Sequence, residues 1–346
     1  MKMTQKQRIM AQIQHQETDY VPYTLAIEKC VGEQLDAYYN STSWRGLLDS
    51  SIHLLTWPSK GILVDEEIEG EYIDIYGTAW RLDARPYHIL TPAMPDASFE
   101  HYHLPDIRSC FDPDWELRAS QFIQEHPDHF VVGYIGFGLF ERSWTLRGFD
   151  NALVDSVINP GFYEELIEEL CQHQMGLVER ILHLPVDGMF FSDDWGYQRG
   201  VLLGAKRWRQ FLKPRLARMY TQVHTAGKTV LTHCCGSIAE IIPDLIEIGL
   251  DVLESVQPEA DGMNPYELKR LYGKHLTFWG GLGSQSTIPF GTPDEIKAEI
   301  TRLSREMGHA GGYILAPAKE LQPETPVENA AAVVEGFLRN SGVSFP

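Results

Sequence analysis

The sequence of 346 residues is poor in cysteine, in positive charge and in long apolar runs. Its five cysteines are an odd number and two of them, Cys234 and Cys235, are adjacent, which argues against a disulfide framework. Reduced thiols are typical of a cytoplasmic protein. Only 29 Lys and Arg residues stand against 48 Asp and Glu, and the net charge of −19 repels phosphate backbones, so we expect no nucleic-acid partner.

No stretch of the chain is apolar for long enough to cross a membrane. The longest mostly apolar run, residues 130–140, is far shorter than the roughly 20 residues that a span needs. Residues 1–16 are polar and lack the apolar core of a signal peptide. Because 43% of the residues are hydrophobic, the chain can still form one large core. We expect a single cytoplasmic domain over residues 1–346, outside the membrane.

A short apolar strand, a polar loop and an amphipathic helix recur along the chain. Two helices have strong start signals, because Thr292 and Thr325 are each followed by Pro at the first helical position and Glu at the third. The predicted strands are 21–27, 130–135, 188–192, 229–232, 252–255, 276–279 and 312–316. Alternating strands and helices predict a parallel sheet covered by helices. Seven or eight such units favour a (β/α)8 TIM barrel over an open sheet, which periodicity alone does not exclude.

Residues 32–113 break this rhythm. Residues 43–57 have a helical pattern, and residues 72–81 alternate and then turn at Gly77, which predicts a hairpin. We interpret 32–113 as an inserted helix-plus-hairpin segment that follows the first strand and caps one mouth of the barrel.

One strand ends in a combination of side chains that can bind metal. The β-branched and apolar residues 230–232 are followed by His233, Cys234, Cys235 and Gly236. Side chains two residues apart share a face of a strand, so His233 and Cys235 point to one place and Cys234 points away. An imidazole and a thiolate favour zinc. The alternative is a buried histidine beside a small hydrophobic thiol.

Other polar residues follow the neighbouring strands, and in a barrel the loops after the strands converge on one face. Asp193 and Asp194 follow the strand 188–192, Glu254 ends the strand 252–255, and Lys319 follows the last strand. We predict that Asp193, Asp194 and Lys319 are catalytic, with one of the two aspartates capping a helix or orienting the other. The residues that we expect to contact substrate are Tyr197, Gln257, Gly281 and Gln285.

Five short segments along the chain resemble the uroporphyrinogen decarboxylase superfamily. They are GLFER at 138–142, DDWG at 193–196, HCCG at 233–236, GG at 280–281 and GGYILAP at 311–317, in the order of that family. The resemblance covers nearly the whole length. It implies a single (β/α)8 barrel, in agreement with the predicted strands.

The resemblance implies two chemistries. The decarboxylases of the superfamily remove carboxyl groups from a porphyrinogen without a cofactor, and they hold this polyanion with an arginine pair after the first strand. Residues 25–30 contain no arginine, and the nearest match to the essential aspartate of these enzymes is Asp74, inside the predicted hairpin. An anionic substrate without its arginines loses its strongest contacts. Decarboxylation of the uroporphyrinogen type, in tetrapyrrole metabolism, is therefore our alternative prediction.

The other branch contains zinc-dependent methyltransferases of corrinoid systems. Their zinc is held by His-x-Cys and by a second cysteine after the last strand; His233 and Cys235 match the first two ligands, and Lys319 stands at the third position. We expect a carboxylate, Glu254 or else Asp193 or Asp194, to replace the missing cysteine and to make the zinc a harder Lewis acid.

The resemblance thus predicts an enzyme that moves a methyl group between a small methylated substrate or a thiol and a corrinoid (cobalamin) carried by a separate protein. Zinc is held by His233, Cys235 and Glu254. A site without metal, in which Lys319 lowers the pKa of the Cys235 thiol, and a non-catalytic barrel that only binds a ligand are the other possibilities.

Overall fold

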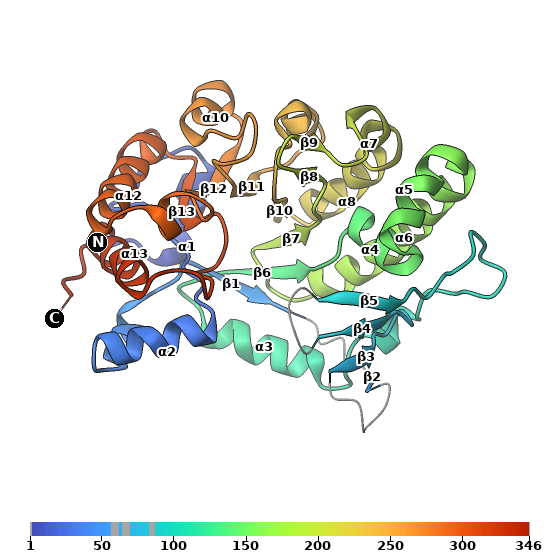
Figure 1. The fold of residues 1–346 in the computed structure, drawn as a ribbon, viewed down its shortest axis with the longest axis horizontal. Helices are drawn as coiled ribbons and strands as arrows, with labels where there is room; N and C mark the ends of the chain where they lie inside the picture. Colours follow the sequence, from blue (N-terminus) through green and yellow to red (C-terminus); the bar gives the residue numbers. More distant parts are fainter. Residues whose placement is uncertain (1, 57–61, 64–69, 83–86, 346) are drawn as a thin grey trace.

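The computed structural model describes residues 2–56, 62–63, 70–82 and 87–345. Its centre is a curled, seven-stranded parallel sheet with the order β1-β6-β7-β10-β11-β12-β13 (Figure 1). The strands are β1 Ile52–Leu55, β6 Phe130–Ile135, β7 Gly188–Ser192, β10 Thr229–His233, β11 Val252–Val256, β12 Thr277–Leu282 and β13 Tyr313–Pro317. Six of the predicted strands and the parallel α/β class are confirmed.

Helices cover the sheet, as Figure 1 shows, and strands such as β6 and β12 are nearly continuous runs of buried residues, whereas Leu54 of β1, at the end of the strand order, is exposed. The helices are α1 Gln5–Ile13, α2 Lys29–Tyr38, α3 Trp115–Glu125, α4 Leu139–Arg147, α5 Phe149–Ile158, α6 Pro160–Leu182, α7 Ala205–Phe211, α8 Lys213–Thr225, α9 Ile242–Glu247, α10 Pro265–Tyr272, α11 Thr287–Phe290, α12 Pro293–Gly308 and α13 Val327–Asn340. Within the described ranges, no helix has both the length and the apolar character that a membrane crossing requires.

The segment 21–27, predicted as the first strand, is not a continuous strand. Tyr23 and Ile27 form isolated parallel bridges with Leu315 and Leu321. On its other side, the amide of Ser51 donates a 2.8 Å hydrogen bond to the carbonyl of Tyr23. The described residues therefore form seven of the eight expected strands, and 21–27 connects β13 with the residue just before β1.

The helix predicted over residues 43–57 is wrong. A short 3-10 helix, η1 Ser43–Leu47, precedes β1, which pairs in parallel with β6. Ile52 and Leu55 are both buried, and their spacing of three residues fits a helix as well as this short strand. The predicted insertion 32–113 therefore includes one strand of the main sheet.

The predicted hairpin is confirmed and belongs to a four-stranded antiparallel sheet, which we call the cap sheet. Its strands are β2 Ile62–Leu63, β3 Glu71–Ile73, β4 Ala79–Arg81 and β5 His88–Thr91. Gly77 turns the chain between β3 and β4 with φ +85°, a conformation that favours glycine. Residues 57–61, 64–69 and 83–86 of the predicted insertion lie outside the described residues.

Three side chains tie the hairpin of the cap sheet to the helices α4 and α6. The Thr78 hydroxyl donates a 3.0 Å hydrogen bond to the carbonyl of Thr145 on α4, and Asp74 pairs with Arg142 one turn earlier. The Tyr76 hydroxyl lies 3.2 Å from Nε2 of His173 on α6. The cap sheet is therefore anchored against α4 and α6.

The contact of His173 with Tyr76 predicts a loss of stability in acid. Burial, followed by the nearby charge of Arg142, lowers the pKa of His173 from 6.5 to about 4. Between these pH values the unfolded chain binds a proton that the folded chain excludes, so stability is complete above pH 6.5 and falls toward pH 4. We expect His173→Gln to reduce this acid-dependent loss by about 2 to 3 kcal/mol at pH 4.5, measured by urea unfolding at pH 7 and pH 4.5. An unchanged difference between the two pH values would contradict this assignment.

The two predicted helix starts differ in outcome. Thr292 caps α12 through Glu295, with the reciprocal hydrogen bonds of a capping box. Thr325 does not cap α13, because that helix begins at Val327 with Pro326 as its N-cap.

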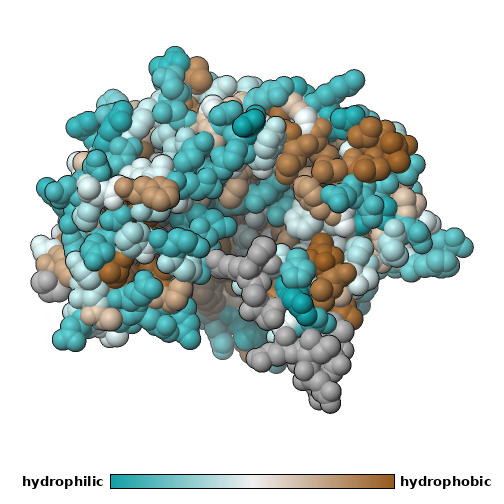
Figure 2. All heavy atoms as spheres, viewed as in Figure 1, coloured by the Kyte–Doolittle hydropathy of each residue, from teal (hydrophilic) through white to brown (hydrophobic). Residues whose placement is uncertain are grey.

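On the surface, Figure 2 shows apolar side chains gathered over α5, where Val157 and Ile158 are more than half exposed.

Candidate functional site

The carboxyl ends of three neighbouring strands bring the predicted polar residues together. In the parallel register, His233 of β10 stands beside Ser192 of β7 and beside Glu254 of β11. Asp194 and Cys235 each follow the end of their strand by two residues. This edge of a parallel α/β sheet is where the loops after the strands carry function.

Asp194, His233 and Cys235 form a group with the geometry of a metal site. One ligand atom from each lies within 4.8 Å of the other two, the one such group found in the described part of the chain. The Nε2 atom of His233 is 3.3 Å from the Cys235 sulfur and 3.3 Å from Oδ1 of Asp194. The predicted convergence of His233 and Cys235 is thus present. The donor set of one nitrogen, one sulfur and one oxygen fits zinc.

Glu254 lies elsewhere than expected for a ligand. Its Oε2 contacts Nδ1 of His233, on the opposite side of the imidazole ring from Cys235. A carboxylate in this place fixes the tautomer and the orientation of a histidine whose other nitrogen binds a metal. The geometry therefore favours Asp194, one of the alternatives considered from the sequence, as the carboxylate beside His233 and Cys235.

Neighbouring charges shift the pKa values of His233 and Asp194 in opposite directions. Burial lowers the pKa of His233, but the charge of Glu254 and the hydrogen bonds from Asp194, Cys235 and Glu254 outweigh it and raise that pKa well above 6.5. For Asp194 the signs are reversed. Burial raises its pKa, but the hydrogen bond and the charge of His233 outweigh burial and bring that pKa below its ordinary value. Without a metal, the site thus holds a protonated imidazole between two carboxylates, and a metal ion that binds Nε2 takes the place of its proton.

Asp193 has a different environment from Asp194. It is 1% exposed, and its carboxylate accepts hydrogen bonds from the amides of Phe140 (3.0 Å) and Glu141 (2.8 Å) and from the Trp195 indole (2.7 Å). The two amides belong to the first turn of α4, so Asp193 caps that helix from a neighbouring strand. Of the two aspartates predicted as catalytic, Asp193 thus makes the capping contacts and Asp194 faces the metal group.

The loop after β10 depends on two glycines and on Cys234. Cys234 points away from the metal group, as predicted, and its buried sulfur accepts a 3.2 Å hydrogen bond from the amide of Trp195. Burial raises the pKa of this thiol, so Cys234 stays protonated. Gly236 has φ +77°, and a Cβ on Gly196 would lie 2.5 Å from the carbonyl of Cys235. The close approach of these loops places Cys235 beside Asp194.

A cavity of about 380 Å³ opens beside this group. Among its lining residues are Asp194, Tyr197, Cys235, Gln257, Gln285 and Lys319, all predicted from the sequence. Gln257 also accepts a 3.0 Å hydrogen bond from the amide of Gly236, and Lys319 is exposed at the rim, where its charge contributes to the low pKa of Asp194. One wall of the cavity is therefore acidic and metal-binding, and the other carries a cation.

Gly281 is the predicted contact residue that the cavity does not include. It has φ +94°, and a Cβ at this position would contact Leu303, Pro265 and the Tyr313 hydroxyl. These groups belong to the helices that cover the sheet and to the neighbouring strand, so the contact of Gly281 with a substrate stays a prediction that this cavity does not support. Glycine is needed there for the backbone conformation.

Two residues that we did not predict lie beside the site. Glu141 and Arg142, at the start of α4, line a second cavity of about 360 Å³ together with Ser192 and Phe137. Burial, then the charges of Asp193 and Asp194, raises the pKa of Glu141 to about 8, so it is protonated near neutral pH. The signal was available: residues 136–142 follow the strand 130–135 as directly as Asp193 follows its own strand.

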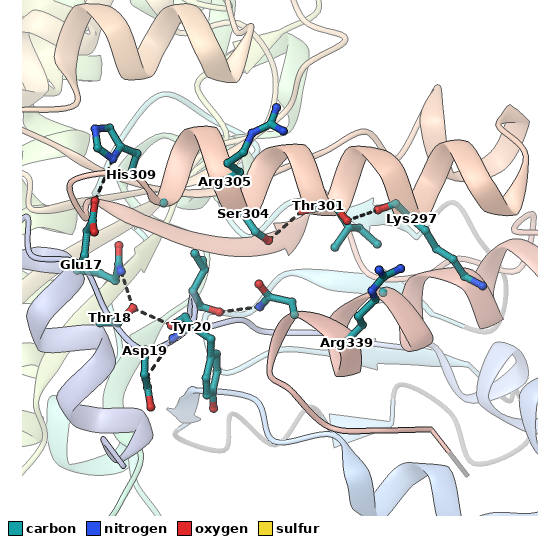
Figure 3. A pocket seen from close by; sticks show the side chains of 16 residues that line it. Glu17, Thr18, Asp19, Tyr20, Lys297, Thr301, Ser304, Arg305, His309 and Arg339 are labelled. Atoms are coloured by element: carbon teal, nitrogen blue, oxygen red, sulfur yellow. Dashed lines mark hydrogen bonds and ion pairs between the residues drawn. The ribbon is translucent and has the colours of Figure 1, made fainter. Parts of the chain in front are cut away.

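A further cavity of about 550 Å³ lies at the opposite edge of the sheet (Figure 3). It is formed by the loop Glu17–Tyr20, which precedes the segment 21–27, and by α12 and α13, with an ion pair between His309 and Glu17. The amino ends of the strands meet there, where function is uncommon in this architecture. It is therefore separate from the candidate site.

Comparison with known proteins agrees with this fold. The sequence model of the family "Uroporphyrinogen decarboxylase (URO-D)" matches residues 144–337. The solved structure of a methyltransferase from Methanosarcina mazei superposes with a TM-score of 0.72 over 98% of this chain and 99% of that one, at 20% identity, which is evidence for the fold.

Curated enzymes match parts of the chain. The "Methylcobamide:CoM methyltransferase MtaA" of Methanosarcina barkeri is 33% identical over 137 residues, or 38% of this chain and 36% of its own length. The uroporphyrinogen decarboxylase of Thermus thermophilus is 25% identical over 173 residues, or 50% of this chain and 47% of its own length. The chain thus matches less than half of the length of either relative.

Proposed function

Because the chain belongs to the uroporphyrinogen decarboxylase (URO-D) family, whose relatives here include a methylcobamide methyltransferase, we propose that it is a metal-dependent methyltransferase. It moves a methyl group between a small methylated substrate or a thiol and a corrinoid held by a separate protein. The observation that carries this proposal is the convergence of Asp194, His233 and Cys235 beside a cavity.

Zinc is the metal that suits the three side chains, through Nε2 of His233, Sγ of Cys235 and a carboxylate oxygen of Asp194. When bound, it supplies a Lewis acid that stabilises negative charge on the heteroatom from which the methyl group departs or to which it is added. Glu254 keeps the proton on Nδ1 of His233 and thereby leaves Nε2 free as a ligand. Our predicted ligand Glu254 is thus replaced by Asp194.

Two further residues act on the substrate in this proposal. Glu141, protonated near neutral pH, donates a hydrogen bond to the leaving heteroatom in the adjacent cavity. Lys319 at the rim holds an anionic part of the substrate or partner. Asp193 is a positioning residue, since its three hydrogen bonds fix the start of α4 and with it Glu141.

A Glu254→Gln variant tests the role of the partner of His233. Loss of such a carboxylate typically weakens metal binding or activity 10- to 100-fold. We expect a loss of this size in zinc affinity, measured by competition with a chromophoric chelator, while the exposed Glu267→Gln on α10 stays at the wild-type value. Equal affinity in both variants would contradict the role of Glu254.

Methyl transfer itself is tested by mixing the protein with corrinoid proteins under anaerobic conditions and following the cobalt absorption spectrum. Methoxy, methylamino and thiol compounds are added in turn. A change from the reduced to the methylated cobalt spectrum, or the reverse, supports the proposal. No change with any of the three classes contradicts it.

The alternative activity is decarboxylation, which the match to the Thermus enzyme and the replacement of a cysteine ligand by Lys319 favour. Turnover of uroporphyrinogen by metal-free protein would establish it and exclude the first proposal. A non-catalytic barrel would show neither activity. A (β/α)8 barrel closed by the segment 21–27 between β13 and the start of β1, a single domain over 1–346 and a cytoplasmic location are parts of the same proposal.

A further inference from the structure

A cavity lined mainly by aromatic rings lies between the cap sheet and α4. Its volume is about 490 Å³. Among the described residues, those that line it are Tyr72, Asp74, Tyr76, Trp80, Leu82, Tyr87, Phe137 and Arg142. Five of these eight are aromatic, and Trp80 and Phe137 lie with their ring centroids 5.7 Å apart. Such walls favour a flat ring, which stacks on their faces or meets their edges.

The same cavity is lined by a buried cation, Arg142, whose hydrogen bonds to the described residues are long. Arg142 is 7% exposed and lies over the rings of Tyr76 (3.9 Å) and Phe137 (5.0 Å). Its Nη1 makes two long contacts, 3.3 Å to Asp74 and 3.4 Å to Thr145. Its Nε is buried without any hydrogen-bond partner among the described residues. Among the described residues, the hydrogen bonds of this guanidinium are thus few and long, and because Arg142 lines the cavity, a ligand that supplies an acceptor oxygen to its guanidinium is expected here.

The charges of the cavity select an anion over a cation. The carboxylate of Asp74 is saturated, because it accepts hydrogen bonds from the amides of Tyr76 (2.9 Å) and Thr78 (3.0 Å) and from the Trp80 indole (3.0 Å) besides its pair with Arg142. The guanidinium already occupies one face of Tyr76. An ammonium ligand would therefore meet a cation in place of a free carboxylate, whereas a carboxylate ligand meets the guanidinium of Arg142.

This cavity leads toward the metal group. Phe137 and Arg142 line both it and the second cavity, which extends to Glu141 and Ser192. Ser192 is the register neighbour of His233 on β10. Phe137 has φ +53°, an uncommon conformation for a bulky side chain, and stands between Gly136 and Gly138 at the junction of the two cavities. A ring in the aromatic cavity can therefore extend a substituent toward Glu141.

We infer that the aromatic cavity binds an aromatic carboxylate and that the substrates are methoxylated aromatic acids. The second half of this statement rests on the proposed function; the binding site does not. In the transfer, the methyl C–O bond breaks and its electron pair stays on the phenolic oxygen, which leaves as a phenolate and takes its proton from water. The methyl group bonds to cobalt(I) of the corrinoid protein, which supplies the electron pair of the new bond and becomes cobalt(III).

The site is tested by calorimetric titration of the full chain, without metal or corrinoid. The probes are 4-methoxybenzoate, methoxybenzene, which lacks the carboxylate, and 4-methoxycyclohexanecarboxylate, which lacks the flat ring. We expect 4-methoxybenzoate to bind at least about tenfold more tightly than the other two. Methoxybenzene lacks the carboxylate that contacts Arg142, and 4-methoxycyclohexanecarboxylate lacks the flat ring that stacks on the aromatic walls.

Two variants locate the binding. Trp80→Leu is expected to weaken the binding of 4-methoxybenzoate roughly five- to tenfold, and Arg142→Lys, which removes the planar guanidinium, about 10- to 100-fold. Arg180→Lys on α6, where the guanidinium stacks on Phe111, is the matched control and keeps wild-type binding. If Arg142→Lys fails to fold by circular dichroism, Trp80→Leu alone decides.

Three results would overturn the inference. They are equal binding of all three probes, unchanged binding in Trp80→Leu, and methyl transfer from methanol or a thiol by a protein that does not bind 4-methoxybenzoate. The last result would leave the proposed function intact. Conversely, tight binding of 4-methoxybenzoate without methyl transfer would support the site and contradict the proposed function.

Discussion

A Cys235→Ala variant is expected to lose its metal. The wild-type protein should hold about one zinc per chain, and the variant less than about a tenth of that, because two remaining protein ligands do not retain zinc against dilution and dialysis. Cys235 lies 3.3 Å from the ligand atom of His233, and its backbone amide donates a 2.8 Å hydrogen bond to Asp194. Elemental analysis after dialysis measures the loss, and methyl transfer should fall with it.

The control for this variant is Cys30→Ala, an exposed thiol on α2. It removes a cysteine without touching the metal group, so its zinc content should equal that of the wild type. Zinc retained in Cys235→Ala, or lost equally from both variants, would show that the metal binds elsewhere. Asp194→Asn should also lose affinity, since a neutral amide is a poorer zinc ligand than a carboxylate.

An Asp193→Asn variant is expected to be destabilised by about 2 to 4 kcal/mol. The buried carboxylate accepts hydrogen bonds from two amides of α4 and from the Trp195 indole. An asparagine offers one acceptor oxygen in place of two, and its amino group would face a donor. Urea unfolding followed by circular dichroism gives the change in the free energy of unfolding.

Asp150→Asn provides the comparison for this substitution, because Asp150 is exposed on α5. It should change stability by less than about 0.5 kcal/mol. The zinc content of folded Asp193→Asn should remain that of the wild type, since Asp193 faces away from the metal group. Normal stability together with zinc loss would instead make Asp193 a ligand.

The candidate site was largely predictable because its residues follow the ends of strands. The alternation of side chains along β10 put His233 and Cys235 on one face, and the order of the strands put Asp194 and Glu254 beside them. Which carboxylate joins the metal group was not predictable. It depends on the orientation of the imidazole ring, and the register pairing of Glu254 with His233 turns Nδ1 toward Glu254.

The fold was less predictable where the chain leaves the regular repeat. In β1, two buried residues three apart fit both a helix and a short strand, and only the pairing with β6 decides between them. The aromatic cavity combines residues of the cap sheet and its loops with Phe137 and Arg142, which are at least 50 positions away. Such contacts arise from tertiary packing, and no local sequence pattern predicts them.

Zinc X-ray absorption spectroscopy of the purified protein tests the central claim most directly. A site built from Asp194, His233 and Cys235 predicts one sulfur at about 2.3 Å and the remaining nitrogen and oxygen ligands at about 2.0–2.2 Å. The sulfur signal should disappear in Cys235→Ala reloaded with excess zinc. Two sulfur ligands, or none in the wild-type protein, would contradict the account.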